Sequence, residues 1–307
     1  MKLHHIRNVV AVVERGSLRS AAKHLGLAQP AMSRSIRELE DELGVVLFER
    51  NKFGMTLTPV GEIFLRRAKG MQADLQRALD EIEQFKGKDF GKITVAFSAA
   101  SLGTMLPKLI APFRQRFPNV RVKVLESALP VMEPDLRDGV VDVFYGPVPE
   151  DYSDPALIIE RLWDNPRIIV GRRGHPLRGA TSLEQLADAG WVAAHMTMDI
   201  DTEVVAVFEA AGLPPPRVVM EAGSSLSFTT IIKSSDLLAP MSALLLELMD
   251  EEEVLEAFPI RGLPNAAPIC AVRRGNMPLT PAAEYWNDLV VRVAGHRVHQ
   301  LQQAGAA

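Results

Sequence analysis

Apolar residues recur with the period of an α-helix through the first part of the chain. The pattern predicts a helix over residues 3–14 and two further helices around a tight turn at Gly26, a residue that can leave a helix in a left-handed conformation. Pro30 suits the first turn of the third helix, where a backbone N–H can be spared. The apolar seam of this third helix is formed by Met32, Ile36, Leu39 and Leu43.

The opposite face of the third predicted helix is polar and basic. It carries Gln29, Ser33, Arg34 and Arg37, whose donors suit base edges and phosphates in a major groove. The alternative is that both arginines only pair with the carboxylates at positions 38, 40 and 41 on a solvated helix. The context favours DNA, because a second basic segment follows at residues 50–57. We interpret that segment as a β wing whose cations contact the phosphate backbone, with a plain hairpin as the alternative.

Residues 59–87 are predicted to form one long helix that is capped by Thr58. An apolar stripe at helical spacing runs along this polar rod and consists of Ile63, Ala68, Met71, Leu75, Leu79, Ile82 and Phe85. Because the stripe needs a surface to bury against, we expect it to pair with the same helix of a second chain. Packing on its own chain is the alternative. Gly87 and Gly91 mark a hinge after the helix.

Beyond the hinge, strands alternate with helices, which is typical of an open parallel sheet. The first set has strands at 92–97, 120–126 and 141–145, with helices at 102–117 and before Gly139. The second set has strands at 167–171, 190–194, 217–221 and 237–241, with helices at 183–187, 204–211, 226–233 and 243–248. A strand at 269–273 and a helix at 282–294 follow. Pro112 lies inside a predicted helix and is expected to kink it.

Ligands of open parallel sheets bind beyond the carboxyl ends of the strands, where helix N-termini direct free N–H groups outward. This rule selects Ser98, Ser101, Thr104, Ser127, Tyr145, His195, Met196, Ser227, Phe228 and Met241 as candidate ligand-binding residues. Their hydroxyls, backbone donors and apolar surfaces suit a small anion with an apolar body. Each has a purely structural alternative: Ser98 and Ser101 as helix caps, His195 as a hydrogen-bonded structural residue, and Phe228 and Met241 as core.

Composition limits the class of protein. The chain has 307 residues, of which 47% are hydrophobic, enough for two or three domains with cores of their own. No apolar run is long enough to span a membrane, and the N-terminus lacks an apolar leader, so we expect a cytoplasmic protein that does not bind membranes.

The sequence contains no motif of a common enzyme class. One cysteine, Cys270, excludes an internal disulfide, and its apolar surroundings indicate a buried strand thiol rather than a nucleophile. A phosphate-binding glycine loop, HExxH and GxSxG are absent from the sequence. We therefore expect no enzymatic activity, no metal and no cofactor.

The charge is unevenly distributed. Residues 1–58 contain 9 Lys and Arg against 6 Asp and Glu, a balance of +3, which leaves −7 for the rest of a chain whose formal net charge is −4. A modestly basic N-terminal segment is compatible with DNA binding if the protein dimerises, because a dimer makes twice as many contacts with DNA.

The segment 17–61 resembles the winged helix-turn-helix of LysR-type transcriptional regulators. The matching positions are Ala21, Ala22, Leu25, Gln29, Pro30, Ser33, Ile36, Leu39, Glu40, Leu43, Gly44, Leu47, Phe48, Arg50, Leu57, Thr58 and Gly61. The resemblance extends over the whole chain in length and domain order. Within the family, the chain is similar to regulators of aromatic or sulfonated-aromatic catabolism and of sugar-binding-protein operons.

The resemblance implies an all-α winged helix-turn-helix domain (1–58), a linker and dimerisation helix (59–87), and an α/β effector-binding domain like periplasmic binding proteins (91–307). The last would have subdomain I at about 91–163 and 269–300, and subdomain II at about 164–268. DNA would be bound by Ser17, Gln29, Pro30, Ser33, Arg34, Arg37, Arg50 and Lys52. The dimer would be formed by Ile63, Met71, Leu75, Leu79 and Ile82.

The partners implied are double-stranded promoter DNA, a small-molecule effector such as an aromatic acid, further copies of the chain in a dimer or tetramer, and RNA polymerase. Effector binding would change subunit packing and DNA bending. The alternatives are an architectural DNA-binding protein that ignores small molecules, and a small-molecule enzyme or carrier with a vestigial DNA-binding head.

Overall fold

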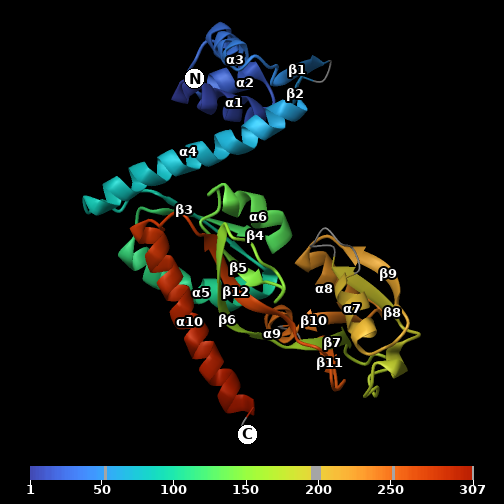
Figure 1. Ribbon diagram of the computed structural model, residues 1–307. Helices are drawn as coiled ribbons and strands as arrows, with labels where there is room; N and C mark the ends of the chain where they lie inside the picture. Colours follow the sequence, from blue (N-terminus) through green and yellow to red (C-terminus); the bar gives the residue numbers. More distant parts are fainter. Residues whose placement is uncertain (52–53, 195–201, 251–252, 306–307) are drawn as a thin grey trace. The chain divides into compact units, whose positions relative to one another are not determined.

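The computed structural model describes residues 1–51, 54–194, 202–250 and 253–305 (Figure 1). The chain forms two compact units, one of residues 1–83 with 138–140 and the other of residues 84–137 with 141–307. Within the described residues, no helix has the length and apolar character needed to cross a membrane.

The first unit has the predicted order of helices and strands. It contains α1 (Leu3–Arg15), α2 (Leu18–His24), α3 (Gln29–Leu43), β1 (Phe48–Asn51), β2 (Gly54–Leu57) and α4 (Pro59–Phe85). Strands β1 and β2 form an antiparallel hairpin that pairs Phe48 with Leu57. The winged helix-turn-helix and the long helix after it are therefore confirmed.

Local chemistry explains the boundaries of these helices. Gly26 has φ = 66°, as the turn between α2 and α3 requires. The Thr58 hydroxyl accepts a hydrogen bond from the Gly61 N–H at 2.9 Å and so caps α4. Met32 and Leu39 are completely buried, whereas Leu43 is 39% exposed. The predicted apolar seam of α3 therefore ends at Leu39, one turn earlier than expected.

One half of the second unit is built on a five-stranded sheet with the order β4-β3-β5-β12-β6. The strands are β3 (Lys92–Phe97), β4 (Arg121–Glu126), β5 (Val143–Pro147), β6 (Leu157–Asn165) and β12 (Ala266–Arg274). β3 is parallel to β4 and β5, as predicted. β12 is antiparallel to both β5 and β6. The sequence pattern predicted β12 but not β6.

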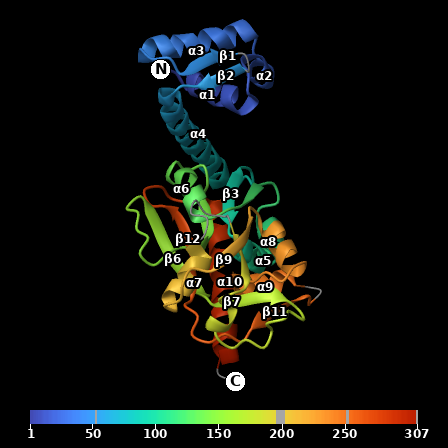
Figure 2. The same cartoon turned by 90° about the vertical axis from the view of Figure 1, so that its right-hand side faces the viewer.

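Helices cover both faces of this sheet. They are α5 (Ala99–Arg116), α6 (Leu129–Arg137) and α10 (Pro281–Gly305). Phe113 of α5 meets Trp286 of α10 edge to face, with ring centroids 5.0 Å apart, and α6 packs a second core on the other face. α5 and α10 lie side by side in both ribbon views (Figures 1 and 2). The helix α5 continues through Pro112, where a kink was predicted, and also through Pro107.

The other half of the second unit has two small sheets. β7 (Arg167–Arg172) pairs antiparallel with β10 (Ala239–Ser242) and β11 (Leu255–Phe258), and β8 (Gly190–Ala194) pairs parallel with β9 (Arg217–Ala222). The helices are α7 (Thr202–Ala210), α8 (Ser225–Lys233) and α9 (Ala243–Met249), with only a 3₁₀ turn, η1 (Glu184–Leu186), where a helix was predicted over 183–187. β6 and β12 connect the two halves, which gives the expected two-subdomain α/β architecture.

Candidate nucleic-acid interface and effector site

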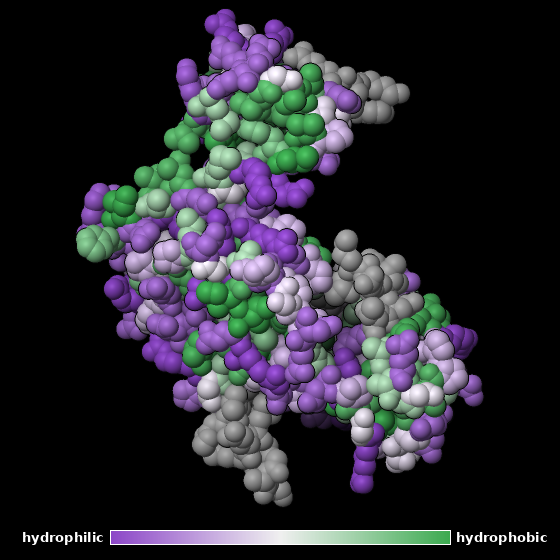
Figure 3. All heavy atoms as spheres, in the orientation of Figure 1, coloured by the Kyte–Doolittle hydropathy of each residue, from purple (hydrophilic) through white to green (hydrophobic). Residues whose placement is uncertain are grey.

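The outward face of α3 holds the predicted DNA-binding residues. Gln29, Pro30, Arg34 and Arg37 are exposed, and Ser33 is partly buried. Figure 3 shows a hydrophilic surface over this helix. The side chains that would read base edges therefore reach solvent from a rigid element whose other face is core.

The arginines of α3 are not held by their acidic neighbours. Among the described residues, Arg34 and Arg37 form no ion pair with Glu38, Glu40 or Asp41. Glu40 instead accepts hydrogen bonds from the backbone N–H groups of residues 47 and 48. The alternative in which these cations serve only local salt bridges finds no support in the geometry.

The remaining predicted DNA contacts divide into two groups. Ser17 caps α2, because its hydroxyl accepts a hydrogen bond from the Ser20 N–H at 3.1 Å, so its side chain already has a structural role. The backbone of Arg50 lies in β1, while its side chain and the whole of Lys52 lie outside the described residues. Their contacts with DNA stay a prediction.

The apolar stripe of α4 is exposed along most of its length. The exposed fractions are 61% for Ile63, 43% for Met71 and Leu75, 50% for Leu79, 51% for Ile82 and 90% for Phe85. Ala68 differs, since it is fully buried beside Ile6 and Val10 of α1. Hydrophobic surface on α4 is visible in Figure 3. Such a row of exposed apolar side chains is typical of a surface that another protein covers.

The hydroxyls that follow β3 mainly stabilise the start of α5. The Ser98 hydroxyl accepts from the Ser101 N–H at 3.3 Å and donates to the Ser101 hydroxyl at 2.9 Å. Ser101 is completely buried, and the Thr104 hydroxyl donates to the Ala100 carbonyl at 2.8 Å. Helix capping, the structural alternative for Ser98, is therefore what the geometry shows.

Three other candidates lie in hydrophobic cores. Tyr145 is completely buried, and its hydroxyl donates to Asn287 Oδ1 at 3.0 Å. Burial raises the pKa of this phenol well above its ordinary value. Phe228 and Met241 are 5% and 2% exposed and pack together with Ile232 in one core. These side chains offer little surface to a ligand in this structure, and their first role is packing.

The start of α8 is more elaborate than the sequence analysis expected. Ser224 and Ser227 form a capping box, in which each hydroxyl accepts from the other residue's N–H at 3.1 Å. The Ser225 hydroxyl donates to Glu126 Oε1 at the end of β4, with a separation of 2.5 Å. The serine run at 224–227 was a signal for such a box. No sequence pattern could identify the partner of Ser225, because it is 99 positions away.

The contact between Glu126 and Ser225 joins the two halves of the second unit. Next to Glu126, the Ser127 N–H donates to the Phe97 carbonyl at 2.9 Å, which holds Ser127 beside the end of β3. The start of α8 thus contacts the carboxylate at the end of β4, and Ser127 follows that carboxylate directly along the chain. His195 and Met196, which were predicted to face the same region, lie outside the described residues.

Cys270 is buried, as its apolar surroundings in the sequence predicted. It is 4% exposed, and burial raises the pKa of its thiol. Across the described part of the chain, no three His, Cys, Asp or Glu residues are grouped so that they could hold a metal ion.

Two family models match the chain. Residues 3–62 match the bacterial regulatory helix-turn-helix proteins of the lysR family, and residues 86–295 match the LysR substrate binding domain. The regulator TdcA of Escherichia coli K12 is 28% identical over 237 residues, covering 77% of this chain and 76% of TdcA. The regulator BenM of Acinetobacter baylyi is 31% identical over 234 residues, covering 71% of this chain and 73% of BenM.

Solved structures share the fold. Full-length CbnR complexed with its target DNA superposes with a TM-score of 0.69 at 21% identity, covering 95% of this chain and all of CbnR. Full-length BenM gives a TM-score of 0.56 at 24% identity, covering 97% of this chain and 98% of that structure.

Proposed function

Since the chain belongs to the LysR family of DNA-binding transcriptional regulators, we propose that a small organic anion in its substrate-binding domain controls how its helix-turn-helix binds promoter DNA. An aromatic acid is the class of anion that we favour. The observation that carries the proposal is the contact of Ser225 with Glu126, which ties the start of α8 to the end of β4.

The DNA-binding role assigned to α3 rests on its exposed polar face. Gln29, Arg34 and Arg37 have donors that can bind base edges, and Ser33 can reach a phosphate. The wing would place Arg50 and Lys52 against the flanking backbone, which adds affinity without sequence information. CbnR, which shares the fold, has been solved in complex with its target DNA, and this supports DNA binding as the role of the present chain.

The effector role rests on the starts of α5 and α8, because the contact of Ser225 with Glu126 marks where the two halves of the domain meet. The charge of Glu126 opposes an anion beside its carboxylate, so the ligand would have to bind at the helix starts. Backbone N–H groups in the first turns of α5 and α8 favour a negatively charged ligand group. The Ser98 and Ser227 hydroxyls already cap these helices, so a ligand would compete with the caps. Ser127, beside the end of β3, can orient that group. An anion bound there would contact both halves of the domain, and could therefore favour one relative arrangement of the halves over another.

Oligomerisation would carry the signal to DNA. The exposed stripe of α4 suits pairing with the same helix of a second chain, and two such dimers would make a tetramer. A change in the effector domain would then alter the spacing and bending of DNA half-sites. The protein would act in the cytoplasm beside RNA polymerase and without catalysis of its own.

A thermal-shift screen of the full-length protein tests this proposal. The library contains aromatic carboxylates, sulfonates and sugar acids, and each compound is assayed with the wild type and with Ser225→Ala. A ligand that binds only the folded state stabilises it by about 2.7 kcal/mol at a hundredfold excess over its Kd. We expect an aromatic acid to raise the Tm of the wild type and to change its DNA footprint. If no compound in the library does so, an architectural DNA-binding protein becomes the better description.

A further inference from the structure

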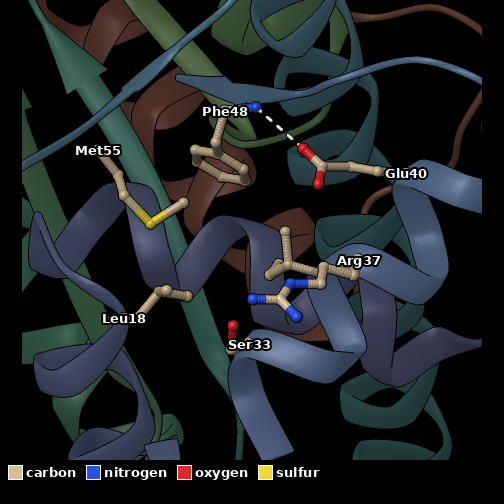
Figure 4. A pocket seen from close by; sticks show the side chains of 7 residues that line it. Leu18, Ser33, Arg37, Glu40, Phe48 and Met55 are labelled. Carbon is tan, nitrogen blue, oxygen red and sulfur yellow. Dashed lines mark hydrogen bonds between the residues drawn. The ribbon is translucent and has the colours of Figure 1, made fainter. Parts of the chain in front are cut away.

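The chain segment between α3 and the wing is held by one carboxylate. Glu40 Oε1 accepts a hydrogen bond from the Leu47 N–H at 2.8 Å. It accepts a second one from the Phe48 N–H at 3.1 Å, which Figure 4 shows. Leu47 and Phe48 are the residues at which the chain enters β1. A side chain of the DNA-reading helix thus fixes the point from which the wing departs.

The N-cap residue of α4, Thr58, also holds this segment. The Thr58 hydroxyl donates to the Val46 carbonyl at 2.8 Å, and the Thr58 N–H donates to the Leu47 carbonyl at 3.0 Å. We call residues 46–48 the wing base. Its backbone is bound by α3 through Glu40 and by α4 through Thr58.

Packing and hydrogen bonds together hold the wing base against α3, because Leu47 and Phe48 are buried in one core with Ile36 and Leu39. A cavity of about 170 Å³ lies between α3 and the wing, lined by Ile36, Arg37 and Glu40 of α3 and by Phe48 and Met55 of the hairpin. Figure 4 shows the carboxylate of Glu40 directed at the backbone of Phe48, away from the Arg37 guanidinium. The hydrogen bonds that Glu40 accepts therefore stabilise the position of the wing base in addition to its packing.

We propose that Glu40 is a positioning residue for DNA binding, which fixes the wing base so that the β1–β2 hairpin can lie on the phosphate backbone. The proposal rests on the wing's proposed role in contacting DNA. Glu40 acts here as a hydrogen-bond acceptor and not as a charge. Its negative charge by itself opposes binding to a polyanion, so the two roles predict opposite effects when the side chain is removed.

Four variants of the full-length protein separate these roles. Glu40→Ala removes acceptor and charge, Glu40→Gln keeps an acceptor without the charge, and Glu40→Asp keeps the charge but shortens the reach. Asp41→Ala is the matched control, because Asp41 is an exposed neighbour on the same helix and its loss removes the same charge. Fluorescence anisotropy with a random-sequence DNA duplex measures affinity over a range of salt concentrations, and circular dichroism checks folding.

The positioning role predicts weaker binding for Glu40→Ala and Glu40→Asp, with a salt dependence flatter by about 0.9 in log–log slope for each phosphate that the wing no longer neutralises. Glu40→Gln should bind at least as tightly as the wild type, and so should Asp41→Ala. If Glu40→Ala and Glu40→Asp bind like the wild type, or if Glu40→Ala matches Asp41→Ala, the proposal is wrong. Should Glu40→Ala unfold, the comparison of Glu40→Asp with Glu40→Gln decides alone.

Arg50→Ala distinguishes this proposal from the one on which it rests. A wing that contacts DNA predicts that Arg50→Ala also flattens the salt dependence. An unchanged slope for Arg50→Ala would refute the wing's contact with phosphate. A flattened slope for Arg50→Ala, together with normal binding by the Glu40 variants, would refute only the role of Glu40.

Discussion

Gly61 in the first turn of α4 has no room for a side chain. A Cβ built there would lie 2.1 Å from the Leu47 carbonyl oxygen, so the close approach of α4 to the wing base depends on glycine. We expect Gly61→Ala to destabilise the first unit by about 1–3 kcal/mol. Gly295 in α10 has open space around it, and Gly295→Ala should instead stabilise by up to about 1 kcal/mol. Thermal unfolding of the two variants measures both effects, and equal shifts would contradict this account of Gly61.

His5 is a second residue whose environment sets a measurable property. It is 3% exposed, and its pKa is lowered by burial and then by His4, against the opposing effects of Glu42 and Glu38. Because the unfolded chain binds a proton more readily, this histidine costs stability as pH falls below its ordinary pKa of about 6.5. We expect His5→Phe to lose less stability than the wild type between about pH 7 and pH 5. Parallel pH dependences of Tm for the two proteins would show that His5 contributes nothing.

Among single residues, the predicted cap of α4 is confirmed, whereas the ligand contacts stay predictions. Thr58 caps α4 as expected, because a cap needs only neighbours along the chain. Tyr145 was expected to face a ligand but is bonded to Asn287, which is 142 positions away. Such a partner depends on how α10 packs on the sheet, which local spacing does not encode.

At the scale of elements, the α4 stripe makes the clearest prediction. Leu75→Asp together with Leu79→Asp should shift the protein toward monomer, because two charges would be buried in the proposed helix pair. Leu177→Asp, which changes an exposed leucine outside α4, serves as the control and should leave the oligomer intact. Sedimentation velocity measures the outcome. A double variant that sediments like the wild type would mean that α4 is not the dimer interface.

The hydrophobic pattern predicted some strands of the structure and missed others. β3 and β8 were predicted with their observed bounds, because both are buried apolar runs bordered by turns. β6 was not predicted, since its residues alternate between buried and exposed without a regular pattern and end in Asp164 and Asn165. The mixed sheet could not be deduced either. β12 begins at Ala266 and pairs antiparallel with β6, which ends at Asn165, and local periodicity does not encode a pairing between strands so far apart in the sequence.

For the whole molecule, the sequence was sufficient to predict the order of a DNA-binding head, a linker helix and a two-subdomain α/β domain. The order of helices and strands follows from changes in periodicity, and the uneven charge, +3 in residues 1–58 against −7 in the rest, agrees with a basic DNA-binding segment. The roles of the three parts came from the resemblance to LysR-type regulators. The contact between Ser225 and Glu126 could be identified only from the structure, because the two residues are 99 positions apart. The effector proposal therefore depends on tertiary placement far more than the DNA-binding assignment does.

The most direct test of the account is a selection of bound sequences from a random DNA pool by the full-length protein and by Arg34→Ala with Arg37→Ala. Each specific base contact is worth about 1–3 kcal/mol of discrimination, and the two arginines are exposed on α3. We predict that the wild type enriches a motif with two related half-sites, and that the variant folds normally but enriches none. Enrichment of the same motif by both proteins, or of no motif by the wild type, would contradict the assignment of α3 as the helix that reads DNA.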